Sequence, residues 1–438
     1  MFPENFTMLL IFTQKVTPRV TYAFKHLFTR ILGIEVRFTT EIEVFISHTG
    51  AKISYGKQAL GNELFFQSHG LLNQMGIESV DVTVKEWDDV PCFFSTSDKS
   101  AIPFDIFSAS FYLLSRYEEY QPHVKDGLGR YPASESIGFK NQFLEIPVID
   151  VWAYKLKAVL KESFDGLIFP KKKMKSAVIA NAQAPFAYIQ KGVYRSFIAY
   201  FNDLIGLRFN SILNRTRVIF GFQRDPHDTF KWLVNVTKNN SLKLFVFFLL
   251  GEANSFDESI NTHRKRFKML IKTVSDYHQV GLLVSEKALK NNEILKIEKL
   301  KLVSITNRKL LNSLNLNFVV NLPEIYRNLV ELEVEKDFTM VYENVVGFRA
   351  GTCTPFLFYD LDYEIRTPLI IYPISCTSKG FNRLSPNGII EKVTRIIDVV
   401  DSVNGTFSMI FSNQDFSIDP NNKVWRTLIS ETIPSYEK

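Results

Sequence analysis

Cysteine is scarce in this sequence of 438 residues. The three cysteines, Cys92, Cys353 and Cys376, are too few to build a disulfide framework in a chain of this size, and none has the Cys-x-x-Cys spacing that would hold zinc. The sparse cysteine usage favours a reducing compartment, and we expect a cytoplasmic protein.

Long apolar runs are also missing. The run Met8–Phe12 is too short for a signal sequence, and the run at 243–250 falls well below the roughly 20 apolar residues of a membrane-spanning helix. Lys and Arg exceed Asp and Glu by 52 to 46, without a dense basic stripe. We therefore expect neither a membrane span nor a nucleic-acid partner.

Several motifs that define enzyme classes are absent. The seven histidines never occur in an HxxxH or HExxH spacing, and there is no GxSxG, GxxxxGK(S/T) or GxGxxG segment. Local patterns thus disfavour a helical zinc site, a nucleophile elbow, a phosphate loop and a dinucleotide turn.

The first part of the chain mixes strand and helix signals. A strand is expected at 6–12, and a helix begins at Thr17 and Pro18 and ends at Gly33. Further helices are expected at 104–120 and 151–163, with short alternating segments at 34–38 and 42–47 between them. The lysine-rich break at 170–173 predicts a domain boundary, with a smaller α/β (α+β) domain over 1–170.

After residue 175, apolar runs alternate with longer helical patterns. This order predicts an α/β domain over 171–438, built on a parallel sheet or barrel. The clearest helix is 388–403, and it leads directly into one of the runs. The expected strands are 176–180, 244–250, 279–284, 317–320, 368–374 and 406–411.

Two loops carry residues that could act in binding. Asp228, beside Thr229, is a candidate helix cap. Arg349 lies between Gly347 and Gly351, where its guanidinium could fix an anionic ligand or pair with a neighbouring carboxylate. Spacing alone does not choose between these roles.

Long collinear segments resemble the bacterial polysaccharide deacetylase family of the NodB-homology type, preceded by its uncharacterised amino-terminal domain. The resemblance covers nearly the whole chain. It rests on LIFTQKVTPRVTYAFKHLFTRILGIE (10–35), FSASFYLLSRYEEY (107–120), FLEIPVIDVWAYKLK (143–157), DFTMVYENVVGFRAGTCTPFLFYDL (337–361) and NGTFSMIFSN (404–413).

The resemblance implies a distorted (β/α) barrel that binds a divalent metal such as zinc at its strand ends. The metal would polarise an acetamide carbonyl and activate water, while an Asp acts as base and a His as acid. At the positions where the family carries these groups, this chain has two amides, two leucines and a serine: Asn181, Gln183, Leu283, Leu316 and Ser412.

The changes lead us to expect a metal-free pseudoenzyme. An amide cannot act as a general base and is a weak zinc ligand, and a serine cannot replace an imidazolium. Tyr188, Asp228, Arg349 and Asp360 match the family and form a possible ligand groove for a carbohydrate or for a protein of polysaccharide synthesis. Leu283 and Leu316 could instead fill the former metal cavity.

Two alternatives stay open. The chain could be an active N-deacetylase that uses displaced residues such as His278, Asp276 or Asp360, with a divalent metal. It could also be an interaction module that uses the charged and aromatic segment 115–120, unless Arg116, Glu118 and Glu119 form ion pairs across the domain boundary.

Overall fold

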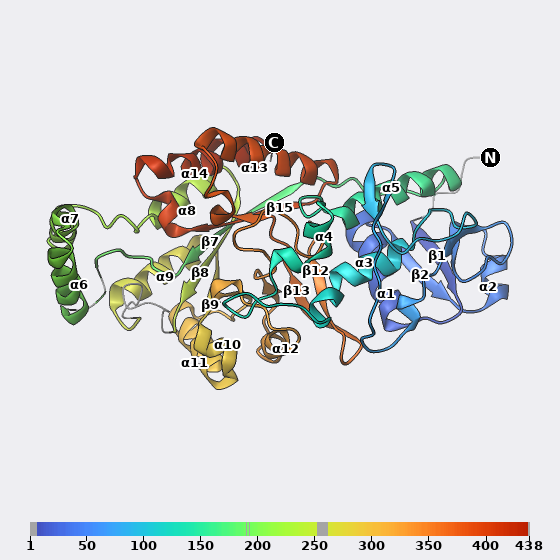
Figure 1. The fold of residues 1–438 in the computed structure, drawn as a ribbon, viewed down its shortest axis with the longest axis horizontal. Coiled ribbons are helices and arrows are strands. Elements are labelled where there is room, and N and C mark those ends of the chain that lie inside the picture. The colour runs from blue at the N-terminus through green and yellow to red at the C-terminus, as the bar shows by residue number, and fades with distance from the viewer. Residues whose placement is uncertain (1–6, 190, 192, 252–261, 437–438) are drawn as a thin grey trace.

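The computed structural model describes residues 7–436, apart from 190, 192 and 252–261. The amino-terminal part forms a four-stranded parallel sheet, and the remainder forms a nine-stranded sheet (Figure 1). The chain is thus a mixed α/β protein with two sheets.

The first sheet has the strand order β2-β1-β3-β4. Helix α1 (Pro18–Phe24) begins where predicted, because the Thr17 hydroxyl accepts a hydrogen bond from the Val20 N–H. A π-helix continues it to Leu32, and Gly33 ends it with φ of 78°. The strands are β1 (Met8–Thr13), β2 (Glu35–Thr39), β3 (Lys52–Gly56) and β4 (Leu64–Gln67), with a separate hairpin of β5 (Lys85–Trp87) and β6 (Val90–Cys92).

Two expectations for this part are wrong. Residues 42–47 form helix α2 (Ile42–Ser47), with Phe45 packed against Phe12 of β1. The helix expected at 104–120 ends early, as α3 (Ile106–Leu114), because Arg116 adopts a left-handed conformation with φ of 55°. The other helices are α4 (Ile137–Lys140) and α5 (Val148–Ser163).

The second sheet has the order β12-β13-β11-β10-β9-β8-β7-β15-β14, and only β12 runs antiparallel to its neighbour. Its strands are β7 (Lys175–Ala182), β8 (Lys243–Leu249), β9 (Gln279–Val284), β10 (Asn312–Asn315), β11 (Lys336–Asp337), β12 (Phe356–Asp360), β13 (Ile365–Ile371), β14 (Cys376–Thr377) and β15 (Thr406–Ser412). The strand expected at 317–320 is wrong, because Asn317 and Phe318 have positive φ and the strand lies before them.

The short segment after β13 forms backbone hydrogen bonds with two strands from different parts of this sheet, β11 and β15. Tyr372 donates its N–H to Asp337 O beside β11, and Ser375 donates its N–H to Ser408 O of β15. The helices are α6 (Val193–Ile205), α7 (Phe209–Ile219), α8 (Phe230–Asn239), α9 (Lys265–Tyr277), α10 (Glu286–Lys290), α11 (Asn292–Thr306), α12 (Glu324–Glu331), α13 (Pro386–Ser402) and α14 (Lys423–Thr427).

One large hydrophobic cluster runs through both parts of the chain, from Leu9 to Ile433. A second cluster lies on one face of the second sheet. None of the helices in the described residues has the length and apolar character needed to cross a membrane.

Candidate functional site

Two of the positions that the resemblance assigns to catalysis, Asn181 and Ser412, lie at the carboxyl ends of two adjacent strands. Asn181 of β7 pairs in register with Ser412 of β15 and with Phe247 of β8, and Gln183 follows β7 directly. Since side chains alternate along a strand, Asn181 points to the same face as Ile179. The structure therefore brings Asn181 and Ser412 side by side, as the resemblance implies.

The two leucines fill the neighbouring space. Leu283 of β9 and Leu316 after β10 are both buried, and both belong to the second hydrophobic cluster. Its other members are Ala177, Ile179, Phe245, Phe247, Leu249, Leu314, Phe318, Phe338, Val341, Ile374 and Ile410. The region around Leu283 and Leu316 is thus an apolar core and not an open groove.

The side chains at these positions do not fit a divalent metal. The Asn181 Oδ1 atom is buried without a hydrogen-bond partner, and it is a weaker ligand than a carboxylate. In the part of the chain that the structure describes, no three His, Cys, Asp or Glu side chains are grouped so that they could hold a metal ion. No reaction step through a metal follows from this set of residues.

Ser412, at the position where the resemblance implies a proton donor, caps a turn in this structure. The Ser412 Oγ atom accepts a hydrogen bond from Gln414 N–H, and Asp415 accepts one from Ser412 N–H, which together cap the turn after β15. The Asn413 Nδ2 atom donates to Ala184 O and His227 O at 3.1 and 3.0 Å. These contacts join β15 to the loop after β7 and to the loop before α8.

Asp225 organises this region, although the sequence reasoning did not single it out. Its carboxylate accepts hydrogen bonds from the backbone N–H groups of three successive residues, 187–189, at 2.7 to 3.2 Å. The Tyr188 ring lies under the Arg215 guanidinium, 5.0 Å away. The Asp-Pro pair at 225–226 was the available signal, because Asp before Pro favours a turn that its own side chain can close.

Asp228 does not cap helix α8, so that expectation is wrong. Thr229 is the first flanking residue of the helix, and its hydroxyl donates to Asn413 O at 2.8 Å. Asp228 faces Arg266 at 3.6 Å, and burial raises the pKa of its carboxyl. The neighbouring His227 has a pKa lowered by burial, which favours a neutral imidazole.

Arg349 is paired with a carboxylate, which resolves the alternatives for its role. It binds Glu119 through two hydrogen bonds of 2.9 and 2.8 Å, and both side chains are almost fully buried. Gly347 lets the loop before Arg349 pack closely on Leu144, because it has φ of 140° and a Cβ atom there would lie 2.5 Å from Leu144 O. The guanidinium is therefore not available for an anionic ligand.

The segment 115–120 is buried rather than exposed. Arg116 pairs with Glu118 and Glu119 at 2.7 and 2.8 Å, and Glu119 also reaches Arg349. The ion-pair interpretation is confirmed for Glu119, whose partner lies beyond the predicted domain boundary. The interaction-module hypothesis loses the contact surface on which it depended.

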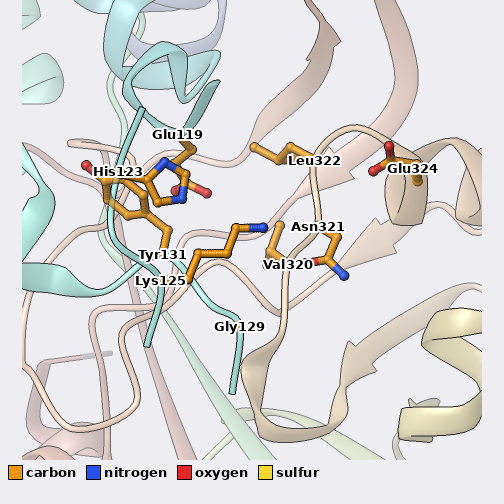
Figure 2. Close-up of a pocket in the computed structure, with 9 residues that line it drawn as sticks. All are labelled: Glu119, His123, Lys125, Gly129, Tyr131, Val320, Asn321, Leu322 and Glu324. Atoms are coloured by element: carbon orange, nitrogen blue, oxygen red, sulfur yellow. The ribbon is translucent and has the colours of Figure 1, made fainter. Parts of the chain in front are cut away.

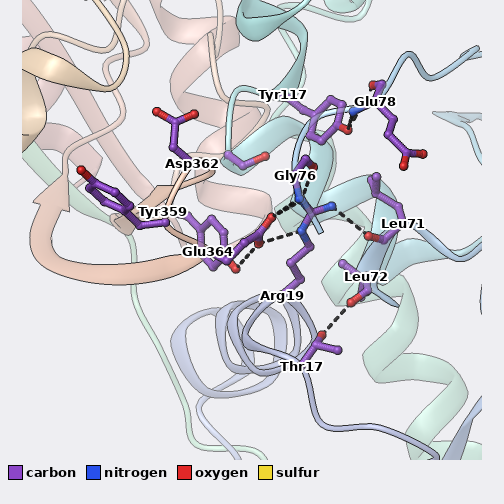
Figure 3. Close-up of polar contacts among 12 residues, drawn as sticks. Thr17, Arg19, Leu71, Leu72, Gly76, Glu78, Tyr117, Tyr359, Asp362 and Glu364 are labelled. Carbon is purple, nitrogen blue, oxygen red and sulfur yellow. Dashed lines mark hydrogen bonds and ion pairs between the residues drawn. The ribbon is translucent and has the colours of Figure 1, made fainter. Parts of the chain in front are cut away.

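A second buried cation, Arg19, also connects residues on the two sides of the predicted domain boundary. We call the contacts between residues 1–170 and 171–438 the seam. The Arg19 guanidinium donates hydrogen bonds from Nε and Nη2 to the two carboxylate oxygens of Glu364 (Figure 3). Glu364 also accepts hydrogen bonds from Gly76 N–H and Tyr359 OH. Asp150 adds three contacts, from Thr352, Cys353 and Thr354.

The displaced residues lie at the other end of the sheet. His278 immediately precedes β9, and its imidazole is near Thr237 Oγ1 and Val234 O; Asp276 lies two residues earlier. Asp360 pairs in register with Ile365, the first residue of β13, and binds Arg327 at 2.6 and 2.8 Å. Asp276 and His278 therefore lie just before β9, and Asp360, the last residue of the antiparallel strand β12, lies beside the start of β13. All three are at the edge of the sheet where the parallel strands begin, away from Asn181 and Ser412.

A separate cleft of about 330 Å³ opens across the seam. His123, Lys125 and Tyr131 line one side of it, and Asn321 and Glu324 line the other (Figure 2). Glu119 and Tyr131 lie on its walls, and Tyr131 also lines a smaller pocket that reaches Phe318 and Val341 of the second cluster. Polar groups from both parts of the chain therefore face one cavity near the end of β10.

Three solved structures show distant likeness to this chain. A Mycobacterium smegmatis protein assigned to the polysaccharide deacetylases has 13% identity and a TM-score of 0.38, over 60% of this chain and 85% of its own. A CE4 family pseudoenzyme from Bacillus anthracis has 10% identity and a TM-score of 0.32, over 61% and 62%. A polysaccharide deacetylase from Bacillus cereus has 12% and 0.30, over 60% and 89%.

No curated protein matches the chain. A family model covers the amino-terminal part of the sequence. Residues 9–165 match DUF7033, a family of unknown function.

Proposed function

We propose that this chain is a deacetylase-like protein without hydrolytic activity, which binds a carbohydrate without cleaving it. The observation that carries the proposal is the replacement of five family positions by Asn181, Gln183, Leu283, Leu316 and Ser412, with both leucines sealed in an apolar core. Amides, leucines and a serine cannot supply the base, the metal ligands or the acid of that chemistry.

The cleft across the seam is the proposed binding site. Lys125, Asn321 and Glu324 offer donors and acceptors that suit sugar hydroxyl groups, and Tyr131 adds an aromatic ring. The volume of about 330 Å³ is at the lower end of the range for ligand sites, which suits one or two sugar rings. The proposed site therefore differs from the groove of Tyr188, Asp228, Arg349 and Asp360 that we expected from the sequence. Arg349 and Asp360 both form ion pairs within the protein.

The proposal keeps the organisation expected from the sequence. Residues 1–170 would form a smaller α/β domain and residues 171–438 a distorted barrel of the deacetylase type. The biological setting would be bacterial polysaccharide metabolism in the cytoplasm, with a glycan or a glycan-synthesis protein as the partner.

The absence of hydrolysis is tested on the purified, tag-free chain. Metal content is measured by elemental analysis, and thermal unfolding is followed during titration with zinc, nickel and cobalt. We expect no stoichiometric metal, no metal-dependent rise in the unfolding temperature and no acetate release from oligomers of N-acetylglucosamine. Metal-dependent release of acetate would overturn the proposal.

Binding is tested by calorimetry with the same oligomers. Lys125→Ala and Asn321→Ala should each weaken binding about tenfold, as expected when one polar contact is removed. Lys57→Ala is the matched control, because Lys57 is exposed and does not line the cleft. Equal affinity of all four proteins would exclude this cleft as the site.

A further inference from the structure

Helices α6 and α7 form a hairpin that stands apart from the rest of the molecule, at one end of its long axis (Figure 1). The hairpin and the segment that follows it, residues 196–224, expose an unusual set of large apolar side chains. Six of them are each at least 63% exposed: Phe197, Ile205, Leu207, Phe209, Phe220 and Phe222.

This concentration differs from the rest of the described surface. Elsewhere the strongly exposed apolar residues are dispersed along the chain, as at Ile46, Met75 and Ile418. Single exposed apolar residues are ordinary, whereas a large contiguous group marks a surface that meets another protein or a membrane. The concentration of exposed apolar side chains within 196–224 therefore points to an interaction surface on the hairpin.

The polar contacts of the hairpin face inward. Tyr200 OH and Thr216 Oγ1 lie 2.9 Å apart between the two helices, and Arg215 binds Asp203 at 2.8 Å with both side chains nearly buried. In a helix pair on a water-exposed surface the apolar side chains normally face inward. Here aromatic and aliphatic side chains face outward, while the hydrogen bonds and the ion pair hold the helices together.

The exposed charges of the hairpin have one sign. Asp203 is the sole acidic residue within 196–224, and it is used by Arg215. The remaining cations, Arg208, Arg217 and Arg224, are exposed, and none forms an ion pair with a carboxylate among the described residues. The outer surface thus combines large apolar groups with an excess of positive charge, although Arg224 lies near the Asp228 carboxylate.

We propose that residues 196–224 bind the surface of a membrane that contains anionic lipids. Apolar side chains would enter the boundary between headgroups and acyl chains, and the arginines would contact lipid phosphates. The helices have 13 and 11 residues, so they would lie in the interface and not span the bilayer. A second copy of the chain fits this surface less well, because three unpaired arginines of each copy would face each other.

The test is sedimentation of the full-length chain with vesicles. One set of vesicles contains phosphatidylcholine alone, and the other contains phosphatidylcholine mixed with phosphatidylglycerol. We expect the protein to sediment with the anionic vesicles, and to be released as salt is raised, because the charges lie at a solvated surface. The chain should remain in solution with neutral vesicles.

Two triple variants separate the apolar and the electrostatic parts. Phe209→Ser/Phe220→Ser/Phe222→Ser should abolish sedimentation, and Arg208→Gln/Arg217→Gln/Arg224→Gln should weaken it by about fivefold for each arginine removed. The controls are Ile46→Ser/Met75→Ser/Ile418→Ser and Arg37→Gln/Arg383→Gln/Arg395→Gln, which change equally exposed residues elsewhere. Circular dichroism is used to check that each variant is folded.

Several results would overturn the proposal. They are the failure of the wild-type chain to bind anionic vesicles, equal binding to neutral vesicles, and equal loss in the control variants. A dimer detected by light scattering that dissociates in the phenylalanine variant, without vesicle binding by the wild-type chain, would assign the surface to a second copy instead. The carbohydrate cleft is built from other residues, so these results leave the proposed function untouched.

Discussion

The inner face of the second sheet and the seam are both buried, but they are built from opposite chemistry. The inner face holds Leu283, Leu316 and their aromatic and aliphatic neighbours, at the place where the deacetylase resemblance implies charged and coordinating groups. The seam holds Arg349, Glu119 and Arg116 in a network with almost no solvent exposure. Burial alone therefore does not decide which side chains a region can carry.

The difference lies in the number of partners. Arg349, Glu119 and Arg116 each face an opposite charge and share several hydrogen bonds, which offset the cost of leaving water, although the Arg116 Nη1 atom has no hydrogen-bond partner. Asn181, on the inner face, has a buried oxygen without a partner. The seam thus holds paired charges, whereas we expect the region around Asn181 to tolerate an added charge poorly. The four predictions below test this distinction.

The largest effect is expected in the seam. Glu119→Gln removes the carboxylate that Arg349 and Arg116 share, so buried positive charge is left without compensation. We expect a loss of roughly 3–5 kcal/mol in the free energy of unfolding, measured with urea. Glu135→Gln, in a partly exposed pair with Lys140, is the control and should cost less than about 1 kcal/mol. Similar losses in both variants would contradict the argument.

A cavity on the inner face should cost somewhat less. Leu283→Ala removes buried methyl groups from a packed cluster, and we expect a loss of about 3 kcal/mol in the same urea measurement. Leu300→Ala is the matched control, because Leu300 is 64% exposed on α11. A small effect of Leu283→Ala, comparable to the control, would mean that the site is an open groove after all.

Restoring a carboxylate on the inner face should also destabilise the fold. Asn181→Asp places a charge among apolar neighbours without a cation or metal to pair with it, at a cost of roughly 1–3 kcal/mol. The loss should be greater at pH 8 than at pH 5, since the buried acid can stay protonated only at low pH. Asn382→Asp, at an exposed position, should have little effect at either pH. A more stable Asn181→Asp variant would point to an unrecognised cation at this site.

The last prediction concerns two carboxylates with opposite pH dependence. Burial raises the pKa of Glu119, but Arg349 and Arg116 outweigh it and lower the pKa to about 2. Its stabilisation is present above the unfolded-state pKa and is lost as pH falls toward 2. Burial raises the pKa of Asp337 to about 6, and hydrogen bonds from Thr339, Ser313 and Tyr326 only partly oppose this.

For Asp337 the sign is reversed. The native state binds more protons than the unfolded state between about pH 4 and 6, so stability should fall as pH rises through that window, by about 1.4 kcal/mol per unit of pKa shift. Asp337→Asn should flatten the pH dependence there and leave the acid limb set by Glu119 unchanged. An unchanged slope between pH 4 and 6 in this variant would refute the assignment.

Local patterns predicted much of the fold. The cap at Thr17, the stop at Gly33 and the strand at 406–411 depend on neighbouring residues, and each was predicted within about two residues. The helix at 104–120 failed because its end depends on Arg116, which turns back to meet Glu118 and Glu119. A conformation stabilised by that buried network is invisible to helical periodicity.

The candidate site was harder to predict than the fold. The five degenerate positions came from the family resemblance, and the structure places Asn181 beside Ser412 and Leu283 with Leu316. The partner of Arg349 is 230 residues away in sequence, so no spacing rule could identify it. The cleft across the seam combines loops from both halves, which no single segment of sequence reveals.

The shared core has a consequence for how this protein can be divided. The largest hydrophobic cluster contains Leu9 and Phe107 together with Phe348, Tyr359 and Ile433. The predicted boundary near residue 170 therefore divides the sequence, but it does not divide the hydrophobic core. Neither half encloses this cluster by itself, so we expect the two halves to unfold together.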